Sequence, residues 1–324
     1  MKAADIQVKS IHQIGITVRD VEKVARGYWN VLGIGPWKIF TIQNNGERTY
    51  HGKPTSFEIK QALCQVGPID LALSQTLTAP TLSSDFMAEH GEGAYRLQYL
   101  VDSLDELDRH VEIMTQRGFS SLMGGHFGSN GAFNYLDTAK ALKTVWGVAK
   151  LPEELVGSAV RYPADEAEVS PHARIKVKAL TQVSLSVKNL EETMESYSNL
   201  LGVGPWQVFE CTPPILHGHT YHGGPGNFTM MAGLAQLGPV ELELIQPLSG
   251  DSVYSDFIRE HGEGINHVQF TVDDVDGIIK IMTEEGFPLL QSGHAIGDDY
   301  FSYYDTRGTL KIIWEAWEPP KKPL

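Results

Sequence analysis

The chain has 324 residues, of which 42% are hydrophobic and 20% charged, and its 26 basic and 40 acidic residues give a net charge of −14. This length fits two domains, and the composition is typical of a folded globular protein. The acidic charge disfavours nucleic acid and anionic membranes as partners, because both would repel it. No apolar run approaches the roughly 20 residues that a membrane span needs, so we expect no membrane association.

Cysteine usage and the N-terminus indicate the compartment. Cys64 and Cys211 form neither a recognisable metal pair nor a disulfide framework. The first residues lack the apolar core of a signal peptide. We therefore expect a cytoplasmic protein.

The chain repeats itself over nearly its whole length. Matched segments include 14–22 with 183–191, 32–37 with 201–206, and 89–93 with 260–264, at offsets of 169 (183 − 14) and 171 (260 − 89). This predicts duplication of a domain of about 150 residues. We place the N-terminal domain at residues 8–151 and the C-terminal domain at 176–320. Residues 152–175, rich in Pro, Glu, Ala and Ser and without a clear strand pattern, are expected to be the linker.

The first part of the C-terminal half predicts a strand, a helix and three strands. Residues 180–187 alternate like a strand, and Asn189 can cap a helix that runs through Leu201 and stops at Gly202. Three further strands are predicted at residues 206–211, 227–237 and 240–246.

The same order then recurs. The pattern predicts a strand at residues 266–272, a helix at 275–285, and strands at 289–291, 300–304 and 310–317. The chain therefore consists of four βαβββ modules and has an α+β fold. One helix covers only one face of a short curled sheet, so two modules side by side leave a cleft on the other face.

The module order and three motifs resemble the vicinal oxygen chelate superfamily. The motifs are Leu201-Gly-Val-Gly-Pro-Trp206, the turn His261-Gly-Glu-Gly264 followed by His267, and Asp305-Thr-Arg-Gly-Thr309. This superfamily includes glyoxalase I, methylmalonyl-CoA epimerase, extradiol dioxygenases and bleomycin-resistance proteins, and the resemblance is closest to the glyoxalase and epimerase branch. It implies two tandem glyoxalase-like domains, each with a curled mixed sheet forming a cleft.

The resemblance also implies one divalent metal in the C-terminal half, with a ligand from the first and last strand of each module. Carried over position by position, the ligands are Gln182, Glu243, His267 and Glu315. Such an oxygen-rich set with one imidazole suits Zn, Ni, Co, Mn or Fe(II). Glu241 shares a strand face with Glu243 because side chains alternate every two residues, and we choose Glu243 for its spacing to the proline at 247.

The N-terminal half serves as an internal comparison. Its equivalents of the four ligands are Gln13, Ala72, Arg96 and Gly147, a set that cannot bind a metal in this way. Packing residues would not be expected to change together to Ala, Arg and Gly. The comparison therefore favours a metal site in the C-terminal half alone.

Several further residues are candidates for substrate contact, with structural roles as the alternative. The candidates are Trp206, Phe228, Met230, His222, His294, Tyr300, Tyr303 and Trp314. Aromatic and methionine residues at strand spacing are more often core residues. His222 and His294 have histidine counterparts in the N-terminal half, which favours structural roles. We interpret His217 and His219 as solvated loop histidines, and Asp298 and Asp299 as loop charges.

A metal in such a site would act as a Lewis acid on a substrate oxygen while Glu315 or Glu243 moves a proton. The sequence thus predicts a glyoxalase-like metal-dependent isomerase or lyase acting on a small organic molecule. An epimerase is also possible, although the position of the base in epimerases aligns with Phe228 or Thr229. A non-haem dioxygenase is the weaker alternative, because oxygen activation usually needs two histidines and one carboxylate. A non-catalytic small-molecule binding or resistance protein is a third. The expected partner is the small-molecule substrate, and a homodimer is left open.

Overall fold

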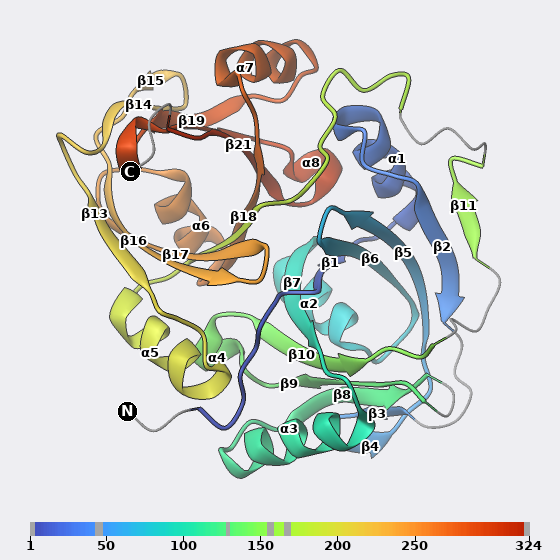
Figure 1. The fold of residues 1–324 in the computed structure, drawn as a ribbon. Helices are drawn as coiled ribbons and strands as arrows, with labels where there is room; N and C mark the ends of the chain where they lie inside the picture. Colours follow the sequence, from blue (N-terminus) through green and yellow to red (C-terminus); the bar gives the residue numbers. More distant parts are fainter. Residues whose placement is uncertain (1–3, 43–47, 128–129, 154–158, 165–169, 321–324) are drawn as a thin grey trace.

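The computed structural model describes residues 4–42, 48–127, 130–153, 159–164 and 170–320. Each half of the chain forms one curled mixed sheet, and the two halves lie side by side (Figure 1). The tandem α+β architecture predicted from the repeat is confirmed. The domain and linker boundaries stay predictions.

The elements of the first half are β1 (Gln13–Thr17), α1 (Val21–Leu32), β2 (Trp37–Ile42), β3 (Arg48–Tyr50), β4 (Lys53–Pro54), β5 (Glu58–Val66), β6 (Ile69–Thr78), α2 (Leu82–His90), β7 (Gly93–Leu100), α3 (Leu104–Gln116), β8 (Ser121–His126), β9 (Ala132–Leu136), α4 (Ala139–Leu142), β10 (Val145–Lys150) and β11 (Val160–Tyr162). Those of the second half are β12 (Gln182–Ser186), α5 (Leu190–Leu201), β13 (Gln207–Cys211), β14 (His217–Tyr221), β15 (Gly224–Pro225), β16 (Thr229–Leu237), β17 (Val240–Ser249), α6 (Val253–His261), β18 (Gly264–Thr271), α7 (Val275–Glu284), β19 (Leu289–His294), the 3-10 helix η1 (Ile296–Asp298), β20 (Tyr300–Tyr304), α8 (Arg307–Leu310) and β21 (Ile313–Glu318).

Two modules meet in mirror order in the second sheet, which runs β13-β16-β17-β12-β18-β21-β20-β19-β14-β15. The two opening strands, β12 and β18, pair antiparallel at its centre, and each pairs parallel with the closing strand of its own module. The hairpin β14-β15 belongs to the first module but adds to the far edge of the second, as β3-β4 does in the first sheet. In each sheet this hairpin thus links one module to the edge strand of the other.

Local sequence determines α5 as predicted. The Asn189 side chain accepts a hydrogen bond from the Glu192 amide, and Gly202 ends the helix with a φ of 66°. Its buried stripe faces the sheet with spacings of three and four residues, through Leu190, Thr193, Tyr197 and Leu201.

Other elements differ from the sequence prediction. The strand expected from residue 310 begins at Ile313, because Leu310 closes the short helix α8 and Lys311 adopts a φ of 65°. The hairpin β14-β15 and the helix α6 were not predicted. His217 and His219 lie on β14 and not in a loop as expected. Within the expected linker, β11 pairs with β2, and residues 154–158 and 165–169 lie outside the described part.

The two halves support each other through reciprocal contacts between equivalent residues. Tyr28 in α1 donates its hydroxyl to the carbonyl of Leu310 in α8, at 2.8 Å. Its counterpart Tyr197 in α5 donates to the carbonyl of Leu142 in α4, also at 2.8 Å. Both tyrosines are fully buried, so each half caps a short helix of the other.

Ion pairs repeat this symmetry. Lys143 lies 3.2 Å from Glu263, and Lys311 lies 3.0 Å from Glu92, each pair joining the two halves.

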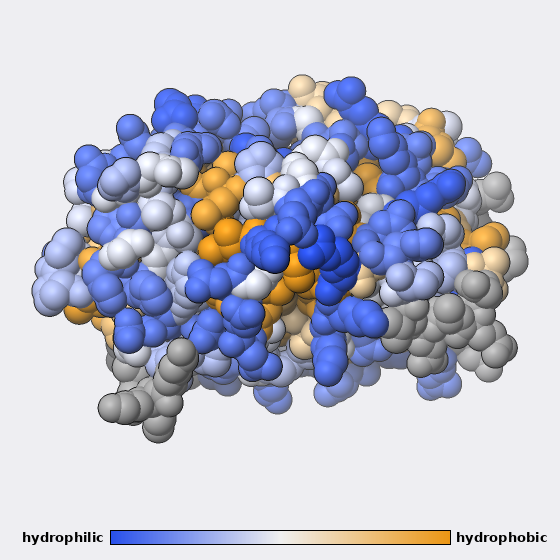
Figure 2. Space-filling view, turned by 90° about the horizontal axis from the view of Figure 1, so that it is seen from above, coloured by the Kyte–Doolittle hydropathy of each residue, from blue (hydrophilic) through white to orange (hydrophobic). Residues whose placement is uncertain are grey.

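On the face shown in Figure 2, hydrophilic residues cover both sides of the molecule and an apolar area lies between them. No helix in the described ranges is long and apolar enough to cross a membrane.

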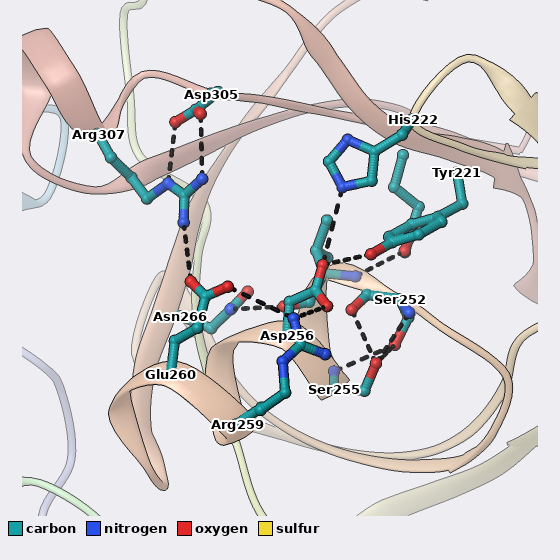
Figure 3. A network of polar contacts seen from close by, with 12 residues as sticks. Tyr221, His222, Ser252, Ser255, Asp256, Arg259, Glu260, Asn266, Asp305 and Arg307 are labelled. Atoms are coloured by element: carbon teal, nitrogen blue, oxygen red, sulfur yellow. Dashed lines mark hydrogen bonds and ion pairs between the residues drawn. The ribbon is translucent and has the colours of Figure 1, made fainter.

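A polar network fixes the exchanged hairpin to α6 (Figure 3). Tyr221 in β14 donates to Asp256 Oδ2 at 2.5 Å, and Arg259 donates to Oδ1 of the same carboxylate at 2.5 Å. The N-terminal half keeps the equivalent contact from Tyr50 to Asp85, at 2.6 Å. Burial alone would raise the pKa of Asp256, but the bonds from Tyr221 and Arg259 outweigh it and lower the pKa.

We predict that Tyr221→Phe lowers the free energy of unfolding by about 1–3 kcal/mol at neutral pH, because it removes a hydrogen bond to a charged group. The lowered pKa of Asp256 means that this stabilisation is present at neutral pH and is lost as the pH falls through the folded-state pKa. Urea denaturation of both proteins should therefore show a difference that shrinks in acid. Tyr50→Phe, which breaks the equivalent contact, should cost a similar amount at neutral pH. A constant difference down to about pH 3 would contradict this assignment.

Candidate metal centre

His267 lies at the centre of the second sheet, on its concave face. It is completely buried on β18, opposite Ser184 of β12. The register between these two strands shifts beside this pair, and Asn266 lies at the irregularity with its Oδ1 2.9 Å from His267 Nδ1. A hydrogen bond at Nδ1 fixes the ring orientation and leaves Nε2 available to bind a ligand.

Two carboxylates converge on that nitrogen. His267 Nε2 lies 3.0 Å from Glu315 Oε2 and 3.4 Å from Glu243 Oε2. The Glu315 and Glu243 side chains are 4% and 12% exposed. Neither His267 Nε2 nor Glu243 Oε2 has a partner in hydrogen-bond geometry, although both atoms are buried. Buried polar atoms of this kind call for a partner that the protein alone does not provide.

The charges in this cluster balance only in part. Burial alone would lower the pKa of His267, but Glu243 and Glu315 outweigh it and raise the pKa to about 9. Burial raises the pKa of Glu315, and His267 counteracts it. Without a metal, a protonated imidazole is therefore the only cation in contact with the two carboxylates among the described residues.

These donors fit a divalent cation, since two carboxylate oxygens and one imidazole nitrogen suit such an ion in a site with little water. His267, Glu243 and Glu315 do not all place their ligand atoms within 4.8 Å of one another. Among the described residues, the His, Cys, Asp and Glu side chains that do form such a group of three are His217, His294 and Asp298. Binding between Glu243 and Glu315 therefore requires one carboxylate to move toward the other. Glu315 is the more restrained of the two, because Gln269 donates a hydrogen bond to it while Glu243 Oε2 has no hydrogen-bond partner.

A chain of two side-chain amides links Glu315 to Glu241. Gln269 Nε2 donates to Glu315 Oε2 at 3.2 Å and lies 3.3 Å from Gln182 Oε1. Gln182 in turn donates from Nε2 to Glu241 Oε1 at 2.7 Å. Gln182 thus belongs to the same polar cluster, and its ligation of a metal stays a prediction. Sequence reasoning missed Gln269, which a two-residue step from His267 places on the same strand face.

In the first half a guanidinium occupies the equivalent position. Arg96 is 1% exposed, donates from Nη2 to Gln13 Oε1 at 2.7 Å and from Nη1 to Gln98 Oε1 at 3.3 Å. Gln13 and Gln98 are the counterparts of Gln182 and Gln269, at offsets of 169 (182 − 13) and 171 (269 − 98). Neighbouring glycines make room, since a Cβ on Gly15 would lie 2.5 Å from Arg96 Cγ.

Three of the candidate substrate residues lie near the cluster. Tyr303 packs edge-on against His267 with ring centroids 4.8 Å apart, and its hydroxyl is 2.8 Å from that of Tyr254. Phe228 and Met230 belong to the same apolar cluster as Tyr303 and are 0% and 5% exposed. These side chains form the apolar surroundings of the polar cluster.

The two tryptophans lie elsewhere. Trp314 is completely buried in the main core against Phe270 and Tyr28, on the opposite strand face from Glu315. Trp206 packs against Tyr197 and donates to Ser198 in α5. Neither placement supports contact with a substrate beside His267, because strand alternation directs Trp314 away from Glu315 and Trp206 packs against α5 before β13 begins.

The remaining candidates lie nearer the surface. His222 is half exposed and 3.7 Å from Asp256, within the network of Figure 3. His294 stacks on Tyr300 at 4.5 Å, and its Nδ1 is 2.8 Å from the carbonyl of Asp299.

Asp299 lies in a loop as expected, between η1 and β20, but it is buried and hydrogen-bonded. It is 8% exposed, and its carboxylate accepts hydrogen bonds from Trp317 Nε1 at 2.9 Å and the Ala295 amide at 2.8 Å.

The chain belongs to the glyoxalase/bleomycin resistance protein/dioxygenase superfamily, whose family model matches residues 12–135 and 181–304. It is similar to the mitochondrial methylmalonyl-CoA epimerase of Dictyostelium discoideum, with 26% identity over 125 residues, which are 38% of this chain and 67% of the epimerase. The bovine epimerase is 27% identical over 119 residues, 36% of this chain and 60% of that protein, so this match spans less than two thirds of it. A variant of 4-hydroxymandelate synthase from Streptomyces coelicolor has the same fold, with a TM-score of 0.61, 15% identity, and coverage of 98% of this chain and 95% of that chain.

We predict that Gly147→Ala destabilises the protein by about 1–3 kcal/mol, because the new Cβ overpacks the site that Arg96 fills. It would lie 2.5 Å from the ring of Tyr135. Gly308→Ala is the matched control, since a Cβ there meets nothing within 4 Å. Urea denaturation should separate the two variants. Equal stability of both would show that the first sheet tolerates a side chain at the position equivalent to Glu315.

Proposed function

We propose that the C-terminal half is a metal-dependent isomerase, epimerase or lyase that moves a proton beside a carbonyl or hydroxyl group of a small organic substrate. The observation that carries this proposal is the convergence of the Glu315 and Glu243 carboxylates on His267 Nε2, at 3.0 and 3.4 Å. A divalent metal bound there supplies Lewis acidity toward a substrate oxygen. We assign it to His267, Glu243, Glu315 and Gln182.

The two carboxylates take different roles. Gln269 holds Glu315 by a hydrogen bond, and this side chain is only 4% exposed, so Glu315 serves as the fixed ligand. Glu243 is 12% exposed, and its Oε2 has no hydrogen-bond partner. Glu243 is therefore the carboxylate whose Oε2 can take a proton from the substrate carbon and return it.

The buried apolar surroundings assist this transfer. Tyr303, Tyr254 and Phe228 exclude water around the carboxylates. A poorly solvated carboxylate is a stronger base, and interactions with developing charge are stronger where water is excluded. Proton movement next to a carbonyl is therefore the chemistry that this environment favours.

The alternatives find less support. Among the described histidines, only His267 is in ion-pair contact with Glu243 and Glu315, whereas oxygen activation at non-haem iron usually takes two histidines and one carboxylate. The cluster of His217, His294 and Asp298 does contain two histidines and a carboxylate, but His217 is half exposed and Asp298 is 77% exposed. A non-catalytic binding protein would not need a buried carboxylate without a hydrogen-bond partner, such as Glu243, beside one that is held by a hydrogen bond, such as Glu315.

Metal affinity tests the ligand assignment. We predict that His267→Gln and Glu315→Gln each weaken Zn²⁺ binding at least about tenfold, since loss even of a supporting contact typically costs that much. Titration calorimetry of the purified full-length protein gives the affinities. His222→Gln is the matched control, and its affinity should equal that of the unaltered chain.

Glu243→Gln should weaken binding more than Glu241→Gln, which alters the neighbouring acid on the same strand face. Unchanged affinity in His267→Gln and Glu315→Gln would overturn the proposed site. The reverse order of Glu241→Gln and Glu243→Gln would assign the second-strand ligand to Glu241.

Hydrogen exchange tests the chemistry. With Zn²⁺ at saturation, the protein should exchange the carbon-bound proton of an α-carbonyl compound with deuterium from D₂O. The probes are methylmalonyl-CoA, chosen for the epimerase relatives, and the thiohemiacetal of methylglyoxal with glutathione. We predict that Glu243→Gln slows exchange by about 10²–10⁴-fold, the usual contribution of a general base. Mass spectrometry measures the label.

Tyr221→Phe, in the hairpin network of Figure 3, contacts neither carboxylate, so it is the control and should exchange at the unaltered rate. Exchange in Glu243→Gln as fast as in the unaltered protein would contradict the role of Glu243. Tight binding of a probe without any exchange would favour the non-catalytic alternative.

A further inference from the structure

The first half encloses a cavity of about 410 Å³ on the concave face of its sheet. This volume lies within the range of small-molecule sites, about 300–1,000 Å³. Its walls are mostly apolar and include Phe57, Met123, Phe133 and Tyr135, while Arg48 and Arg96 also line it. Arg96, the counterpart of the candidate metal ligand His267, thus lines a cationic cavity in the first half.

Arg96 carries a charge that the described residues do not neutralise. It is 1% exposed, and its hydrogen bonds go to the neutral acceptors Gln13, Gln98 and Tyr95. A guanidinium has five N–H groups, so two remain after these three bonds. No carboxylate of the described residues lies within ion-pair distance of it. The guanidinium also lies over the rings of Tyr135 at 4.7 Å and Tyr95 at 5.6 Å. Burying a charge without a counter-charge is costly, so a bound anion would relieve a strong penalty.

Arg48 adds a second buried cation to the same cavity. It lies on the exchanged strand β3 and is 6% exposed, and its Nε has no hydrogen-bond partner. Its guanidinium lies 5.1 Å from the ring of Phe57. Both arginines act electrostatically on the buried Tyr135, so their positive potentials add within one cavity. Two arginines from different modules therefore face the same apolar space.

We propose that this cleft is a metal-independent binding site for a small organic carboxylate with an aromatic or branched apolar body. The planar carboxylate matches the fork geometry of a guanidinium, and the remaining donors of Arg96 are suited to receive it. Phe57 and Phe133 would contact the apolar body. The mostly apolar walls favour a monoanion over a strongly hydrated phosphate dianion. This site is separate from the C-terminal cluster and does not depend on the reaction proposed there.

Calorimetric titration of the full-length protein tests this proposal with three probes, phenylacetate, its neutral analogue phenylacetamide and inorganic phosphate. Phenylacetate should bind one per chain, equally well with and without EDTA. Phenylacetamide and phosphate should each bind at least about tenfold more weakly, because one lacks the charge and the other lacks the apolar body.

Variants assign the binding to this cavity. Arg96→Gln and Arg48→Met should each weaken phenylacetate binding at least about tenfold, while Arg259→Met, at an exposed arginine of the other half, should leave it unchanged. Arg48→Met lies off the sheet centre and keeps the test valid if Arg96→Gln fails to fold. Equal affinity for the acid and the amide, loss of binding with EDTA, retained binding in Arg48→Met, or no phenylacetate binding at all would each overturn the proposal.

Discussion

Charge buried at the centre of a curled sheet must be compensated at that same place, and this constraint shapes both halves of the protein. In the C-terminal half, two carboxylates surround His267, and the cluster is short of positive charge. In the N-terminal half, Arg96 fills the same position, supported by the same pair of glutamines, and the cluster is short of negative charge. The two halves thus hold buried polar clusters of opposite electrostatic demand at equivalent positions.

The two halves also cap short helices of each other. Tyr28 caps α8, which leads directly into β21 and so into Glu315, while Tyr197 caps α4 in return. Because these contacts are reciprocal, neither half can lose its scaffold without disturbing the other. The N-terminal half, which lacks the candidate metal ligands, thus still contributes packing to the other half.

Much of the fold could be predicted from the sequence, because its signals are local or repeated. The alternating pattern, the cap at Asn189 and the glycine at 202 predicted α5 and its neighbouring strands. The repeat showed that His267 and Arg96 occupy equivalent positions in the two halves. The hairpin β14-β15 could not be placed, because its partner strand β19 is about 70 residues away in sequence. The burial of Asp299 was missed for a similar reason, since it depends on the later residue Trp317.

The central claim, that the C-terminal half alone holds one metal, is tested most directly by anomalous diffraction from crystals of the zinc-loaded protein. We expect one strong peak per chain, about 2.1 Å from His267 Nε2 and in contact with Glu315. No peak should lie beside Arg96. A peak confined to His217, His294 and Asp298, or the absence of any peak at His267, would contradict the account.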